Sequence, residues 1–184
     1  MELTDFEQNF KDFTISTELI FLKYFQDKLP EYSEGFYLLV DDKSGIKTWS
    51  ENQDFLDRLM PFAQANCSGS TYGIWNDNTD KPLNELPIVV FGDEGGVHIV
   101  AENILQLMQI LTFDTEISVD FDKAYFYKDQ DDYQESKDNA SYKNWLKENF
   151  HLDPIPDPDK IIETAQQKYK VAFDNWFGQY YKNE

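Results

Sequence analysis

Apolar positions in the chain recur at two spacings, one typical of helices and one typical of strands. Residues 17–27 carry an apolar stripe at helical spacing that ends before Pro30, so a helix is expected there. Residues 36–40 form a short apolar run that predicts a buried strand.

The next segment predicts a second helix. Ser50 and Gln53 have the spacing of a capping box, in which the hydroxyl satisfies a free amide of the first turn and the glutamine reaches back. Apolar side chains follow at helical spacing, namely Phe55, Leu56, Leu59, Met60 and Phe62. A helix is therefore expected to run through these positions.

Strand patterns dominate the middle of the chain. Residues 71–75, 88–91 and 97–100 predict three strands, and the Gly-rich residues 92–96 predict a hairpin turn between the last two. The aromatic run 125–127 is compatible with an edge strand.

Helical spacing returns in residues 101–113 and 141–149, and Asp157 and Pro158 are expected to cap and open a last helix whose apolar face ends near Trp176. Helices before and after a run of strands predict an α+β fold with a central, mostly antiparallel sheet.

Turn residues concentrate in two stretches, 66–86 and 153–159. Neither has the Gly/Ser composition of a linker, and the chain has no internal repeat. Both stretches are predicted to be long loops, and residues 1–184 a single domain.

Charge narrows the choice of partners. The chain has 35 Asp and Glu against 16 Lys and Arg, which gives a formal net charge of −19. Nucleic acids and anionic membranes bind through Lys and Arg, so direct binding to either is not expected. A basic protein is the natural complement of this charge.

The chain also lacks the signals of export. Met1 is followed by acidic residues rather than a basic and then apolar leader, and no stretch approaches a membrane-spanning length. A cytoplasmic location is therefore expected. The single Cys67 cannot form an internal disulfide or a Cys-based zinc site.

Candidate catalytic residues are few. His98 lies between Val97 and Ile99, where strand alternation predicts a surface position, and His151 follows a helix end. Ser68 and Ser70 lack the spacing of a nucleophile elbow. Cys67 has no adjacent cation, so a buried or inert thiol is expected. No enzyme activity, metal or cofactor is predicted.

Two acidic stretches invite comparison with ligand-binding loops. Residues 92–96 contain glycines, but their two carboxylates would repel a phosphate and no Lys-Ser/Thr pair follows. Residues 129–135 resemble a calcium loop only in part, because the central Gly and the closing Glu are missing. Each is interpreted as a solvated turn or as an acidic surface offered to a partner.

Three segments then occur in a recognisable order: GSTYGIW at 69–75, LPIVVFGDEGG at 86–96 and VAENI at 100–104. With WLKENF at 145–150, they resemble the SUKH superfamily. The resemblance extends over residues 19–176, with a signature core at about 19–113 and a C-terminal helical part at about 140–181.

This resemblance implies an α+β fold without enzymatic activity. Most bacterial members of the family are predicted immunity proteins that neutralise a toxin encoded beside them, often a nuclease, and yeast relatives regulate cell-wall glucan synthesis. The signature residues are expected to be structural: Gly69, Tyr72, Trp75, Pro87, Gly92 and Gly95. The acidic loop residues are expected to bind a basic toxin: Asp77, Asp80, Asp93, Glu94, Asp129, Asp131 and Asp132.

Three hypotheses follow. The first is an immunity protein with a single basic toxin as its partner. The second is a regulatory or scaffolding module with several partners. The third is an enzyme that uses carboxylates such as Asp93 and Glu94, and the absence of a catalytic motif in the sequence argues against it.

Overall fold

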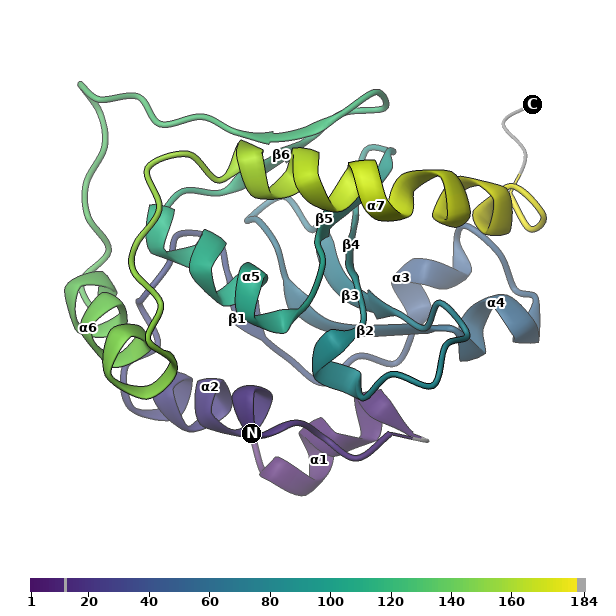
Figure 1. The fold of residues 1–184 in the computed structure, drawn as a ribbon, viewed down its shortest axis with the longest axis horizontal. Coiled ribbons are helices and arrows are strands. Elements are labelled where there is room, and N and C mark those ends of the chain that lie inside the picture. The colour runs from purple at the N-terminus through teal and green to yellow at the C-terminus, as the bar shows by residue number, and fades with distance from the viewer. Residues whose placement is uncertain (12, 182–184) are drawn as a thin grey trace.

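The computed structural model describes residues 1–11 and 13–181. Its centre is an antiparallel five-stranded sheet in the order β1-β2-β3-β4-β5, accompanied by the two-stranded β6-β7 hairpin (Figure 1). The strands are β1 (Tyr37–Leu38), β2 (Leu59–Gln64), β3 (Thr71–Trp75), β4 (Ile88–Phe91), β5 (Val97–Ala101), β6 (Ile117–Val119) and β7 (Ala124–Phe126). The α+β fold that the sequence predicts is confirmed.

Both faces of the sheet are buried. Alternate residues of a strand point to opposite faces, so in β4 Val90 enters one apolar core while Val89 and Phe91 enter the other. Strands buried on both faces have apolar residues at consecutive positions, and every residue of β4 is buried.

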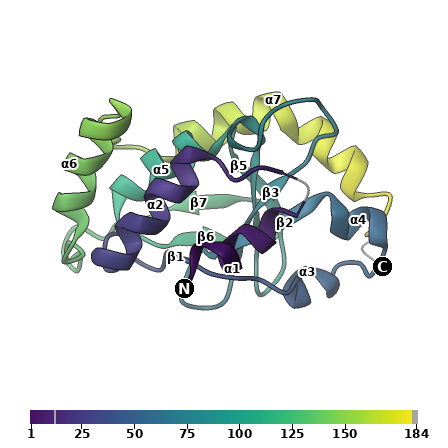
Figure 2. The same ribbon diagram turned by 90° about the horizontal axis from the view of Figure 1, so that it is seen from below.

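Helices cover the two faces. α7 (Asp159–Phe177) packs on the face that carries Trp75 and Val89, along one side of the molecule in Figure 2. The core on the other face, which contains Val90, includes side chains of α1, η1, α2, α5 and α6. The remaining bounds are α1 (Leu3–Glu7), the 3-10 helices η1 (Gln8–Phe10), η2 (Leu83–Glu85) and η3 (Leu111–Phe113), α2 (Thr17–Lys28), α3 (Ser44–Lys47), α4 (Gln53–Asp57), α5 (Ile104–Ile110) and α6 (Asn139–Phe150).

The helix predicted through residues 53–62 is wrong over its second half. α4 ends at Asp57, and the apolar run from Leu59 continues as β2. Pro61 would break a helix interior, whereas in β2 it lies beside a bulge and opposite Gly73. The predicted capping box is also absent, because Asn52 caps α4 by accepting a hydrogen bond from the Asp54 amide.

Strands β3 and β4 have the predicted bounds, and the other predicted elements occur with shifted ends. The first strand is two residues long, and the helix predicted over 101–113 is α5 followed by η3. The last helix begins with Pro158 rather than Asp157 at its N-cap, without a side-chain cap. Strand β6 was not predicted, and it pairs with β7.

Side-chain amides close both edges of the sheet. Gln26 Oε1 accepts a hydrogen bond from the Leu38 amide at 2.7 Å, and its Nε2 donates to the Leu38 carbonyl at 3.1 Å. At the opposite edge, Gln166 Nε2 donates to the Ile99 carbonyl at 3.1 Å. Backbone groups that would otherwise pair with another strand are thereby satisfied.

Candidate functional site

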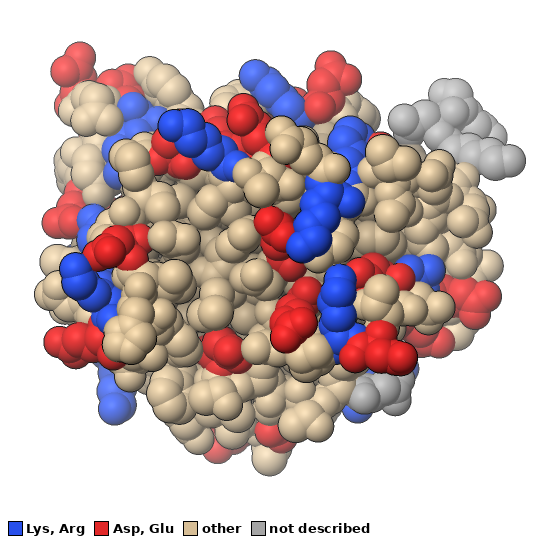
Figure 3. All heavy atoms as spheres, viewed as in Figure 1, with Lys and Arg blue, Asp and Glu red and all other residues tan. Residues whose placement is uncertain are grey.

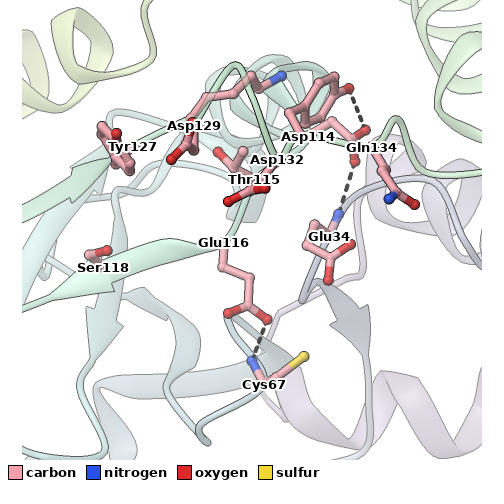
Figure 4. A pocket seen from close by; sticks show the side chains of 12 residues that line it. Glu34, Cys67, Asp114, Thr115, Glu116, Ser118, Tyr127, Asp129, Asp132 and Gln134 are labelled. Carbon is pink, nitrogen blue, oxygen red and sulfur yellow. Dashed lines mark hydrogen bonds between the residues drawn. The ribbon is translucent and has the colours of Figure 1, made fainter.

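An acidic groove of about 670 Å³ opens between the turn before β1, the β2–β3 turn, β6 and the segment that leaves β7 (Figure 4). Its lining includes five carboxylates, Glu34, Asp114, Glu116, Asp129 and Asp132, and one cation, Lys128. Asp129 and Asp132 belong to the predicted partner-binding set, so the structure places part of that set in a concave surface.

Asp114 holds the walls of the groove together. This buried carboxylate accepts hydrogen bonds from the Glu34 amide at 3.1 Å, the Tyr133 hydroxyl at 2.8 Å and the Ser136 amide at 2.8 Å. Its backbone is left-handed, with φ 60°, a conformation that Asp and Asn adopt more readily than other residues. One side chain thus joins two loops that lie about a hundred residues apart in sequence.

Glu116 connects the groove to the β2–β3 turn. Its Oε1 accepts a hydrogen bond from the Cys67 amide at 2.8 Å, and possible ligand atoms of Glu34, Cys67 and Glu116 lie within 4.8 Å of one another. Cys67 is exposed rather than buried. The hydrogen bond between the Cys67 thiol and the Glu116 side chain raises the pKa of the thiol to about 11, and burial contributes a smaller part of this increase.

This trio is the set that could hold a metal ion within the described residues. The protonated thiol is a poor ligand, since metals bind the thiolate, and the trio lacks the imidazoles and additional cysteines typical of zinc sites. The arrangement does not indicate a metal centre.

The outer wall of the groove combines an aromatic ring with carboxylates. Tyr127 is 68% exposed, and Asp129 Oδ1 accepts a hydrogen bond from the Asp131 amide at 3.0 Å. Lys128 is withdrawn, with Nζ 3.7 Å from the centroid of the Tyr133 ring, and burial lowers its pKa. Lys128 interacts electrostatically with Asp114, but among the described residues it forms no salt bridge with Asp129 or Asp132.

Asp93 lies close to the groove. Its Oδ1 accepts hydrogen bonds from the hydroxyls of Ser68 at 2.9 Å and Ser70 at 2.7 Å, and the bond from Ser70 lowers the pKa of Asp93 most. Ser68 directly follows Cys67, whose amide donates a hydrogen bond to Glu116. We call this groove, together with the neighbouring β4–β5 turn, the acidic edge, and its carboxylate residues are Glu34, Asp93, Glu94, Asp114, Glu116, Asp129, Asp131 and Asp132.

Asp77 and Asp80 do not join this surface. They follow the end of β3 that lies away from the β4–β5 turn, so the sheet separates them from Asp93 (Figure 1). The Asp77 side chain is only 9% exposed and pairs with Lys81 Nζ at 3.1 Å. Asp80 is exposed at the far end of the sheet.

The predicted structural residues lie in the core and its turns. Tyr72 and Trp75 are buried on opposite faces of the sheet, and the Pro87 carbonyl accepts a hydrogen bond from the Trp75 amide at 2.9 Å. The glycines Gly69, Gly92 and Gly95 lie in turns; φ is +121° at Gly69 and +117° at Gly95, and a Cβ at Gly92 would lie 2.1 Å from the Gly95 carbonyl oxygen.

The surface position predicted for His98 is wrong. The residue is only 7% exposed, and Nε2 lies 2.8 Å from the Asp120 carbonyl oxygen in the β6–β7 turn. Burial lowers the pKa of His98. His151 is the C-cap of α6, as its position at a helix end suggests.

Charges on the face crossed by α7 are partly compensated within the chain. On the face crossed by α7, acidic and basic side chains are interspersed (Figure 3). Two lysines of α7 pair with carboxylates, Lys168 with Glu102 and Lys170 with Asp174.

Sequence patterns did not point to Glu34, Asp114 or Glu116 as members of the site. These residues meet because β6 lies beside the β2–β3 turn, where Asn66 Nδ2 donates to the Ile117 carbonyl at 3.2 Å. The only sequence signal was the acidic character shared with residues 129–132.

Comparisons with protein-family models, curated proteins and solved structures gave no match to this chain. Among the described residues, no helix combines the length and the apolar character needed to cross a membrane. The candidate function consequently depends on the geometry of the acidic edge and on the sequence resemblance.

Proposed function

We propose that this protein is a non-enzymatic immunity protein that binds and neutralises a cognate polymorphic or contact-dependent toxin, with a basic nuclease as the toxin class. The observation that carries the proposal is the acidic edge, where five carboxylates and one withdrawn lysine line a single groove. A nuclease needs a basic surface for its polyanionic substrate, and an acidic surface can occupy it.

The groove has features of a protein-binding surface. Tyr127 offers a large exposed ring among carboxylates, and exposed tyrosines are frequent anchors at interfaces. The backbone beneath is fixed by the hydrogen bonds of Asp114, so little order would have to be gained on binding.

Growth protection tests the proposal. The open reading frame immediately upstream of this gene would be expressed with and without this protein, and we expect growth to be arrested only in its absence. The edge variant Asp129→Asn/Asp132→Asn should protect less well, because two charges of the groove are removed while the side-chain shapes are kept.

A matched control comes from the far end of the sheet. Asp80→Asn/Glu85→Gln, the far-end variant, removes two exposed carboxylates as well and should protect like the wild type. An upstream product that is harmless, or edge and far-end variants that protect equally, would contradict the proposal. Several partners in a pulldown would instead favour a regulatory module.

A further inference from the structure

A separate cavity of about 360 Å³ lies at the turn of the β6–β7 hairpin, against the C-terminal end of α7. Four aromatic rings from different parts of the chain line it, namely Trp49, Phe121, Phe177 and Tyr181. The cavity is thus built by tertiary packing and not by one local motif.

Three of the rings form a preorganised wall. The centroid of Trp49 lies 4.9 Å from that of Tyr181 and 5.8 Å from that of Phe177, and the latter two are 5.6 Å apart. All three pairs have tilted or edge-on geometry, which favours aromatic contact and restricts ring motion.

The fourth ring, that of Phe121, is exposed on one side and contacts the backbone of Gly95 on the other. Phe121 is 71% exposed, and it rests on Gly95, where a Cβ would lie 2.6 Å from the ring. Only a residue without a side chain allows this close approach, and φ at Gly95 is +117°. An exposed aromatic ring over a built cavity is a feature of binding surfaces.

The cavity also carries unbalanced negative charge. Its charged lining residues are Asp122, Lys170 and Asp174, and Lys170 Nζ pairs with Asp174 Oδ2 at 2.5 Å. Within the part of the chain that the structure describes, Asp122 forms no ion pair. Aromatic faces beside an uncompensated carboxylate attract a cation.

We propose that this cavity receives an arginine side chain of the protein partner. A planar guanidinium can stack on an aromatic ring while its N–H groups bond to a carboxylate, which the compact ammonium of lysine does less well. The β4–β5 turn contributes Gly96 to the cavity and Asp93 and Glu94 to the acidic edge, so the two surfaces share this turn. The inference rests on the proposed function for the nature of the partner.

The test uses the free protein and two capped amino acids. N-acetyl-arginine amide would be titrated while the indole ¹H–¹⁵N signal of Trp49 is followed by NMR, with Trp49→Phe to assign it. N-acetyl-citrulline amide is the matched probe, because it has nearly the same shape but no charge. We expect saturable shifts with the arginine probe and at least about fivefold weaker binding of citrulline.

Two variants locate the contact. Phe121→Ala should weaken binding of the arginine probe about fivefold, and Tyr127→Ala, at the other exposed ring, should leave it unchanged. Absence of saturable shifts, equal binding of the two probes, or equal effects of the two variants would overturn the proposal. Because no toxin is needed, such a failure is distinguishable from failure of the proposed function.

Discussion

At the residue scale, Asp114 is the side chain on which the shape of the groove depends. Asp114→Ala would leave three donors without their acceptor and place alanine at φ 60°. We expect a loss of about 2–4 kcal/mol in the free energy of unfolding, measured by urea denaturation. Asp114→Asn, which keeps one acceptor oxygen and tolerates this backbone, should lose less; equal losses would contradict this role.

Cys67 offers a prediction about reactivity. The thiol is exposed, but its pKa of about 11 leaves little thiolate at pH 8. Alkylation by iodoacetamide should be roughly tenfold to a hundredfold slower than for a free cysteine and should accelerate as the pH rises toward 11. Glu116→Gln should lower the pKa and speed the reaction, whereas rapid alkylation of the wild type at pH 8 would refute the stated cause.

His98 shows why the burial of single residues is hard to predict from strand alternation. The alternation places it opposite Val97 and Ile99, which is correct, but it does not say what covers that side. The β6–β7 turn supplies the Asp120 carbonyl there from 22 residues away. A histidine can be satisfied by one such acceptor, so its burial depends on tertiary contacts.

At the element scale, the edges of the sheet depend on glutamine side chains. Gln26→Leu would leave both the amide and the carbonyl of Leu38 unsatisfied in a buried setting. We expect a loss of about 2–4 kcal/mol in the free energy of unfolding. Gln166→Leu removes only the bond to the Ile99 carbonyl and should cost about 1 kcal/mol. Denaturation curves in which Gln166→Leu costs as much would contradict the argument.

Most elements were predictable because their apolar spacing is unambiguous, as in α2 and in β3 to β5. The strand at residues 59–64 was not predictable from apolar spacing. A strand buried on both faces and a helix with a wide apolar face both have apolar residues at nearly every position, so the spacing does not distinguish them. Pro61 was the available signal against a helix. Strand β6 has only three residues, too few for a pattern.

At the scale of the whole molecule, composition indicated a basic partner but not where it would bind. Five of the seven acidic residues chosen from the sequence lie on the acidic edge. Asp77 and Asp80 do not, because the sequence does not reveal which end of the sheet a loop occupies. Glu34 and Glu116 complete the edge through contacts between distant segments.

Binding of a basic toxin through the acidic edge should depend on salt. Surface charges that steer association act through solvent, so their effect on the association rate must fall as salt shortens the screening length from about 30 Å at 0.01 M to about 3 Å at 1 M. The dissociation rate should respond much less, because packing at the interface is insensitive to salt.

The most direct test is the association rate constant between this protein and the upstream gene product, measured by stopped flow across that range of salt. We expect the association rate constant of the wild type and of the far-end variant to fall at least about tenfold between the lowest and the highest salt. The edge variant Asp129→Asn/Asp132→Asn should associate about fivefold more slowly than the wild type at low salt, and its rate constant should fall less as salt is added. A wild-type rate that does not change with salt, or edge and far-end variants that behave alike, would contradict binding through the acidic edge.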